Sequence, residues 1–208
     1  MRILVCILRI VLLMKNSFSI LIVFLAFATS TFSQSRSDTT FSINGQNFSL
    51  TLVTHDPEQL PLNTILTIWH NGNEMFSDSV FSQNGYYEFL DINDDGFDDL
   101  LVYQSIGARA NETFNLYLYR SDKKDLKKII NYNDWPNMQK TQFKGIVCAT
   151  ILTGSIQYKF FEITDNGDLI DLNVSVEEYK YDGRGYWKGI RKIKRIYPNT
   201  KKVRSRND

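Results

Sequence analysis

An acidic run near the middle of the chain carries the side chains best suited to chemistry. The stretch Asp91–Val102 reads Asp-Ile-Asn-Asp-Asp-Gly-Phe-Asp-Asp-Leu-Leu-Val, with oxygen-bearing residues at its first, third, fifth and ninth positions. Calcium takes roughly 6–8 oxygen ligands at about 2.3–2.6 Å, and alternate side chains of a curled loop can point at one ion. Gly96, at the sixth position, allows the sharp turn that such a loop needs. The spacing therefore predicts a calcium loop.

The predicted ligand set combines side-chain and backbone oxygens. It comprises the side chains of Asp91, Asn93 and Asp95, the carbonyl of Phe97, and Asp99 either directly or through water. Magnesium fits less well because it demands a strict octahedron and keeps its waters. An acidic, solvated turn is the alternative, since Asp, Asn and Gly are ordinary turn formers. Five carboxylates within nine residues repel one another, which favours a bound cation.

The surroundings of this loop differ from those of an EF-hand. Its twelfth position is Val102, where an EF-hand carries a bidentate glutamate. The flanking segments 86–90 and 100–103 are rich in aromatic and aliphatic residues and show no helical repeat. The pattern therefore predicts a strand, the loop and a second strand.

The run Asp91–Leu100 resembles the calcium motif of FG-GAP and VCBS-type repeat proteins, which are extracellular β-proteins and commonly β-propellers. The continuation, through a Gly- and Asn-containing segment at 106–111 and a Tyr-rich strand at 114–119, is similar to small single-domain bacterial members of that group. Some of those members are periplasmic inhibitors of lysozyme-like peptidoglycan hydrolases. The resemblance implies a calcium-binding β domain with a partner in the cell envelope.

The first 33 residues read as a signal peptide. Residues 3–32 are almost wholly apolar, and Lys15 precedes the longest apolar core and a small-residue exit at 28–33. Met14 is a candidate for the true start. A retained membrane anchor is the alternative, but the unbroken core is shorter than the roughly 20 residues that a span requires. We therefore expect an exported protein, periplasmic or secreted.

The rest of the chain is expected to form one domain. Residues 34–40 are predicted to be a disordered linker, 41–198 a calcium-binding β domain, and 199–208 a basic disordered tail. Four Asn-Gly dipeptides and short strands at intervals of about 8–12 residues are typical of an all-β domain of antiparallel strands and hairpins. The resemblance favours a small β-propeller-like arrangement, with a sandwich as the alternative. Residues 186–197 are interpreted as the last strand.

Few other residues offer catalytic chemistry. Cys148 lies in an apolar run and is expected to be a small buried hydrophobe, and His55 and His70 lie at predicted turns. We therefore expect a binding domain rather than an enzyme. The alternatives are a calcium-dependent polysaccharide hydrolase, which needs a catalytic acid such as Glu88, Glu112 or Glu162, and a structural component of adhesion or assembly.

Contacts with a partner are expected near the calcium loop and at the basic C-terminal end. The candidate contact residues are Tyr86, Tyr87, Arg109, Asn111 and Trp135. Residues 180–208 hold eleven basic and two acidic residues, which predicts electrostatic contact with anionic envelope polymers or lipid. Nucleic acid is not an expected partner of an exported protein.

Overall fold

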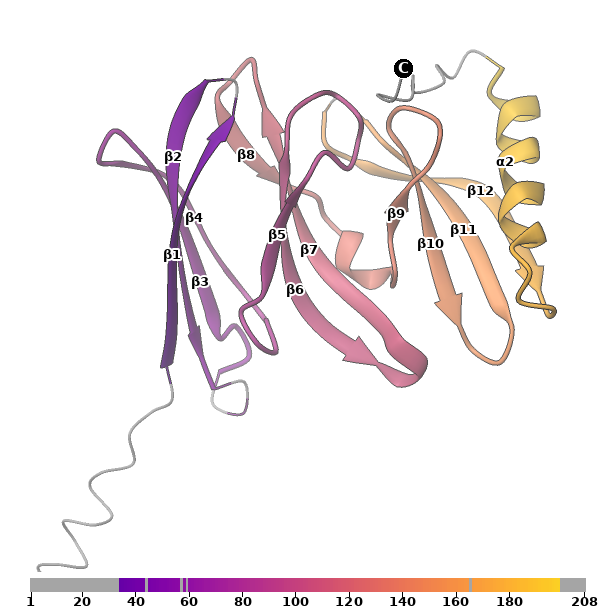
Figure 1. Cartoon of the computed structure of the whole chain (residues 1–208), viewed down its shortest axis with the longest axis horizontal. Coiled ribbons are helices and arrows are strands. Elements are labelled where there is room, and N and C mark those ends of the chain that lie inside the picture. The colour runs from indigo at the N-terminus through magenta and orange to yellow at the C-terminus, as the bar shows by residue number, and fades with distance from the viewer. Residues whose placement is uncertain (1–33, 44, 57, 59, 165, 199–208) are drawn as a thin grey trace, which may run out of the picture. The chain divides into compact units, whose positions relative to one another are not determined.

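The computed structural model describes residues 34–43, 45–56, 58, 60–164 and 166–198 (Figure 1). The chain divides into two units, Met1–Ser33 and Gln34–Asp208, and the described residues all belong to the second unit. The predicted signal peptide and the predicted basic tail at 199–208 lie outside the described residues.

The described part of the chain is built mainly from strands. Twelve strands are present: β1 (Gln34–Ile43), β2 (Gln46–His55), β3 (Thr64–His70), β4 (Asn73–Val80), β5 (Tyr87–Leu90), β6 (Asp99–Gly107), β7 (Asn111–Arg120), β8 (Asp125–Lys128), β9 (Gln139–Lys140), β10 (Ile146–Leu152), β11 (Ile156–Ile163) and β12 (Leu169–Glu178). Two short 3₁₀ helices, η1 (Ala108–Ala110) and η2 (Tyr132–Asp134), and one α-helix, α2 (Arg184–Ile196), complete the elements.

The strands form three four-stranded antiparallel sheets, each made of strands that follow one another in sequence (Figure 1). Sheet A has the order β1-β2-β3-β4, sheet B the order β5-β6-β7-β8, and sheet C the order β12-β11-β10-β9. The prediction of an all-β domain of antiparallel strands and hairpins is therefore confirmed. So is the strand–loop–strand reading of the acidic run, which connects β5 to β6.

The Asn71-Gly72 dipeptide makes the tight turn that its residue types predict. Asn71 and Gly72 connect β3 to β4 with φ values of +51° and +78°. Positive φ at both central residues is what a two-residue type I′ turn requires, and that turn matches the twist of the flanking strands. Pairing of His70 with Asn73 closes this hairpin.

The sheets pack face to face through apolar cores. One core joins sheets A and B, a second joins sheets B and C, and a third joins sheet C and α2. Sheet B serves two cores: Leu100, Val102, Tyr117 and Tyr119 face sheet A, whereas Leu101, Leu116 and Leu118 face sheet C. Strands buried on both faces read as continuous apolar runs, which explains the sequence of β6 and β7. Face-to-face packing corresponds to the sandwich-like alternative.

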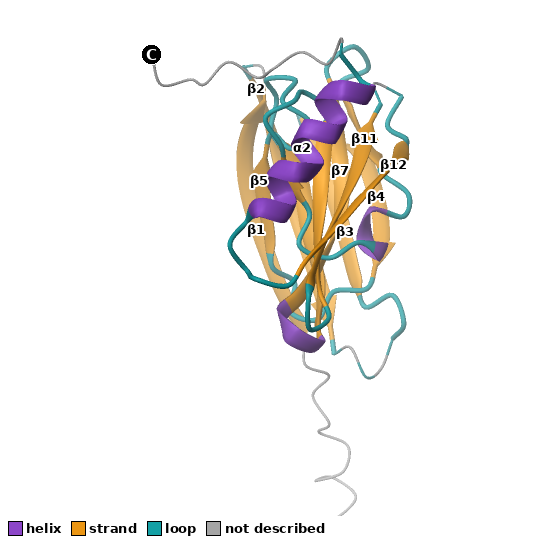
Figure 2. Ribbon diagram, turned by 90° about the vertical axis from the view of Figure 1, so that its right-hand side faces the viewer, coloured by secondary structure: helices purple, strands orange, loops and turns teal. Residues whose placement is uncertain are grey.

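The interpretation of residues 186–197 as a strand is wrong, because this segment forms most of α2. The helix lies across the strands of sheet C (Figure 2) and buries Ile190 and Ile193, one turn apart. Gly189 is also buried, and a Cβ there would lie 2.2 Å from Cε2 of Phe160. Glycine on the buried face permits this close approach but disfavours helix in isolation, so the sequence conceals the helical period.

The prediction of a disordered linker at 34–40 is also wrong. These residues form most of β1, which pairs with β2 without a break from Gln34–His55 to Ile43–Gln46. Side chains of this stretch are largely exposed and polar, so it lacks the apolar alternation that identifies a strand. Backbone pairing, started by the hairpin, extends beyond the part of the strand that faces the core.

Candidate calcium loop and amide-lined groove

The side chains at the first and third positions of the predicted calcium loop fold onto the loop's own backbone. Asp91 Oδ1 and Asn93 Oδ1 both accept the N–H of Asp95, at 3.0 and 3.1 Å. Asp91 Oδ2 accepts the N–H of Gly96 at 3.0 Å. Since two oxygens share one donor, they lie within two hydrogen-bond lengths of each other. The sequence therefore brings these two predicted ligands together.

Asp95 completes the inner part of the loop. Its Oδ1 accepts the N–H of Phe97 at 2.9 Å, and its Oδ2 accepts a hydrogen bond from Asn93 Nδ2 at 3.0 Å. Gly96 has a φ of +100°, which a side chain would disfavour. Asp94, which has no place in the ligand register, instead forms an ion pair with Lys140 at 3.0 Å.

Asp99 lies behind the loop and is fully buried. Its Oδ2 accepts the N–H of Ile92 at 3.2 Å, and its Oδ1 accepts the N–H of Tyr119 at 3.0 Å, so it joins the loop to β7. Burial raises the pKa of Asp99 to about 8, with the nearby charges of Asp95 and Asp91 adding to the effect and the two hydrogen bonds opposing it. The two hydrogen bonds therefore compensate only part of the cost of burying the ionised carboxyl group.

A second buried polar group lies within electrostatic reach of Asp99. The hydroxyl of Tyr132 has no hydrogen-bond partner among the described residues, although Tyr132 is 1% exposed. Burial raises the pKa of Tyr132, and the negative charges of Asp99 and Glu88 raise it further. Buried hydroxyl groups usually have a hydrogen-bond partner, so Tyr132 marks a polar position that the described side chains do not satisfy.

The donor types fit calcium better than a transition metal. The loop offers carboxylate and amide oxygens and the Phe97 carbonyl, and hard oxygen donors of this kind select calcium or magnesium. Within the described residues, no three His, Cys, Asp or Glu side chains are already arranged around a common metal position. Asn93 and the carbonyl of Phe97 fall outside those residue types, and the loop's carboxylates hydrogen-bond to the backbone in this structure.

Cys148 and His70, which the sequence offered as reactive side chains, lie in contacts that hold the fold together. Cys148 is fully buried, and burial raises the pKa of its thiol to about 12, as expected of a small core residue. His70 places Nδ1 at 2.9 Å from the carbonyl oxygen of Asn47 and Nε2 at 3.0 Å from Nδ2 of Asn71. The first contact joins β3 to β2, and the second lies at the turn between β3 and β4.

Two of the predicted contact residues instead hold sheets B and C together. Asn111 donates from Nδ2 to the carbonyl of Leu152 and accepts the N–H of Leu152 at Oδ1, both at 2.9 Å. Trp135 packs against Phe161 with ring centroids 4.8 Å apart and the ring planes tilted by 45°, and Lys159 Nζ lies 4.1 Å from the Trp135 ring centroid. These bonds and contacts give both residues a structural role.

The remaining predicted contact residues lie elsewhere. Tyr86 is 51% exposed and donates its hydroxyl to Glu88 at 3.4 Å. Tyr87 packs against the core between sheets A and B. Arg109 is exposed, with a φ of +62°. Since Asn111 and Trp135 serve sheets B and C, the structure distributes the five residues over separate environments.

A groove that the sequence did not predict lies beside β6 and β7. Its volume is about 740 Å³ including the solvent at its mouth, within the range of ligand sites. The lining comes from β4, β6, β7, β8 and the connections before β3, after β4 and after β8. It comprises Leu62, Val80, Phe81, Gln104, Asn115, Lys128, Ile129, Ile130, Asn131, Asn133 and Asp134. Four of these side chains are amides, and we call the feature the amide groove.

Two amide side chains of this groove are buried with few hydrogen bonds. The Oε1 atom of Gln104 is buried and has no hydrogen-bond partner in the part of the chain that the structure describes. Asn115 is 4% exposed, and its Nδ2 makes one long hydrogen bond, 3.5 Å, to the carbonyl of Phe81. Both residues interrupt apolar runs, at the end of Leu100–Tyr103 and within Phe114–Tyr119. In the sequence, the feature that could have indicated this groove is a polar residue within a strand that is buried on both faces.

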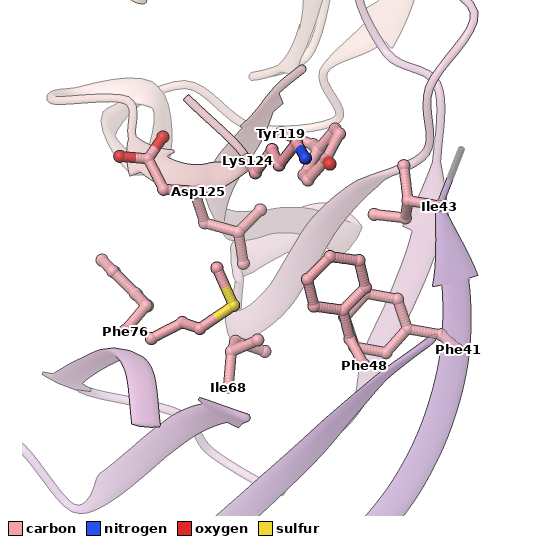
Figure 3. Close-up of a pocket in the computed structure, with 10 residues that line it drawn as sticks. Phe41, Ile43, Phe48, Ile68, Phe76, Tyr119, Lys124 and Asp125 are labelled. Carbon is pink, nitrogen blue, oxygen red and sulfur yellow. The ribbon is translucent and has the colours of Figure 1, made fainter. Parts of the chain in front are cut away.

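A smaller pocket of about 260 Å³ opens between sheets A and B (Figure 3). Its walls are mainly apolar and include Phe41, Phe48 and Ile68, with Lys124 and Asp125 as the charged members. Asp125 is paired with Arg120. Because most of its lining belongs to the core between the two sheets, this pocket is an extension of core packing.

Comparison with protein-family models finds no match, and comparisons with curated proteins and with solved structures find none either. The helices of the described residues include none with the length and apolarity to cross a membrane. The function is therefore inferred from the loop and the groove themselves.

Proposed function

We propose that the chain is an exported, calcium-stabilised domain that binds a glycan or a protein of the cell envelope. Convergence of the Asp91 and Asn93 oxygens on one backbone N–H supports the calcium part. Asp91, Asn93 and Asp95 would hold the ion with the carbonyl of Phe97. Asp99 would hold the loop in place through its hydrogen bonds to Ile92 and Tyr119. Bound calcium supplies positive charge, which offsets the repulsion among these carboxylates.

Recognition of the partner is assigned to the amide groove. Amide side chains donate and accept hydrogen bonds without changing their protonation state, so they suit ligands rich in hydroxyl or amide groups. Leu62 and Ile130, which line the same groove, are 56% and 65% exposed and offer apolar contact beside the amides. The observation that carries this assignment is the buried Oε1 of Gln104, which has no partner among the described residues and is therefore open to a hydrogen bond from a ligand or a water.

A retention experiment on envelope extract tests the proposal. The wild-type domain, Gln104→Met and Gln139→Met are immobilised and exposed to extract in calcium or in chelator. Gln139 is exposed on β9 and outside the groove, so it controls for the change of residue type. We expect one partner to bind the wild type and Gln139→Met, and to bind Gln104→Met about tenfold more weakly, the loss of one good hydrogen bond.

The identity of the retained partner then specifies the function. A muralytic enzyme would indicate the inhibitor role that the resemblance implies, and a glycan would indicate direct glycan recognition. Equal retention by all three proteins would contradict the groove as the binding site. Turnover of the retained glycan by the purified domain would contradict a purely binding function.

A further inference from the structure

Helix α2 presents a row of cations on its outer face. The helix is about 20 Å long at 1.5 Å per residue, and it buries Gly185, Gly189, Ile190 and Ile193 against sheet C. Five basic residues on its other side are exposed: Arg184, Lys188, Arg191, Lys194 and Arg195. Because they recur at spacings of three and four, they form one stripe along the helix, which we call the cationic stripe.

The protein leaves most of this charge unpaired. Among the described residues, Arg184 is the member of the stripe with an ion pair, to Asp182 at 3.0 Å. The nearest buried carboxylate, that of Glu178, is directed inward and accepts the N–H groups of Gly183 and Gly185 at the start of the helix. The other four cations are exposed and form no ion pair with the described residues.

Apolar side chains accompany the cations. Trp187 lies within the stripe and is 53% exposed, and Ile196 at the end of the helix is also 53% exposed. Tyr181 and Tyr179, just before the helix, are 59% and 72% exposed. Tryptophan and tyrosine have an apolar ring with a polar edge and are enriched where a bilayer meets water.

We propose that the cationic stripe docks the domain on the surface of an anionic lipid bilayer, with Trp187 at the level of the headgroups. A straight row of cations can meet a flat surface with all its members at once. The exposed Trp187 and Ile196 gain from a headgroup–acyl boundary, whereas a soluble polyanion offers them only charge. This inference concerns where the domain lies and is independent of the calcium loop and the amide groove.

Docking leaves the fold intact. The apolar face of α2 stays on sheet C, since Ile190 and Ile193 remain buried there and Gly189 seats the helix against Phe160. Binding is therefore peripheral and mainly electrostatic. Each cation near an anionic surface strengthens binding about fivefold at low salt, and added salt should weaken it because the Debye length shortens.

Vesicle binding tests the proposal with a pair of double variants. Lys188→Gln/Arg191→Gln removes two charges from the stripe, and Lys123→Gln/Lys144→Gln removes two exposed charges elsewhere. Each protein is mixed with vesicles of phosphatidylcholine alone or with phosphatidylglycerol, in calcium and in chelator. For anionic vesicles we expect the stripe variant to bind about 25-fold more weakly and the control to stay within about twofold of wild type.

Tryptophan fluorescence adds a second readout. Wild type should show a blue shift on anionic vesicles that is absent in Trp187→Phe, because that ring enters the interface. Equal binding to neutral vesicles, or equal losses in the two double variants, would overturn the proposal. Retention on heparin without binding to anionic vesicles would also overturn it, in favour of a soluble polyanion.

Discussion

The acidic loop Asp91–Asp99 and the cationic stripe of α2 each gather like charges, but they direct them oppositely. In the loop, the side chains of Asp91, Asn93 and Asp95 fold inward onto backbone N–H groups, and Asp99 is fully buried. On the helix, the cations project outward, and four of the five have no ion pair among the described residues.

The difference in direction predicts a difference in role. Charge held inside a fold must be compensated there, so the loop should contribute to stability in proportion to how well a cation neutralises it. Charge on the surface is solvated and costs little free energy. The stripe should therefore contribute little to the free energy of unfolding and much to association with a partner. Each prediction below tests one side of this comparison.

The largest loss of stability is expected when the packing of α2 against sheet C is disturbed. Gly189→Leu places a side chain where even a Cβ would lie 2.2 Å from Phe160, so α2 must shift away from sheet C. We expect the free energy of unfolding to fall by about 3 kcal/mol. Lys188→Ala, on the outer face of the same helix, should change it by less than about 0.5 kcal/mol. Denaturant titration measures both, and equal stability of the two variants would contradict the packing account.

Removal of the buried carboxyl group should have the next largest effect. Asp99→Ala leaves the N–H groups of Ile92 and Tyr119 without their acceptor, which should lower the free energy of unfolding by about 2 kcal/mol in calcium. The neighbouring Asp98→Ala removes an exposed carboxylate and should be nearly neutral. If chemical denaturation finds both variants equally stable, Asp99 does not hold the loop to β7.

The pH dependence of stability in chelator tests the same carboxyl group through its protonation. The pKa of Asp99 rises from an ordinary value of 3.8 to about 8, so between these values the folded protein keeps a proton that the unfolded chain releases. Stability should therefore fall as pH rises through this window, by at most about 1.4 kcal/mol per pH unit. Subtracting the profile of Asp99→Asn isolates this contribution. A difference that grows more favourable with rising pH would have the wrong sign.

The smallest effect is expected at the amide groove. Gln104→Met removes the buried oxygen that has no partner, so stability should be unchanged or rise by up to about 1 kcal/mol. Thermal unfolding checks this beside the control Gln139→Met. A marked loss of stability would mean that Gln104 is a structural residue rather than one held ready for a ligand.

The sequence predicted local features with strong signals and missed those that depend on tertiary packing. Asn71-Gly72 forms its turn because few other dipeptides tolerate two positive φ values, and β12 alternates because one of its faces is buried. Even there, Ile170 is 47% exposed although it belongs to the same alternation, and a register shift between Phe160 and Phe161 interrupts the pairing with β12. No local rule predicts such a bulge.

The two wrong element predictions have physical causes of the same kind. Helix α2 is stabilised by contact with sheet C through Gly185 and Gly189, which are poor helix formers in isolation. The first part of β1 is a strand because β2 offers it a pairing edge, although its side chains are polar. In the candidate loop, spacing located Asp91, Asn93 and Asp95, but the burial of Asp99 required the packing of β6 and β7 to be known.

The central claim is that a cation stabilises the inward-directed carboxylates. Thermal unfolding of the wild type and of Asp95→Ala, each in calcium and in chelator, tests it most directly. We predict that calcium raises the wild-type melting temperature by roughly 5–10 °C when its concentration far exceeds the dissociation constant. Asp95→Ala should lose most of that shift. A wild-type melting temperature that is the same in calcium and in chelator would contradict the account.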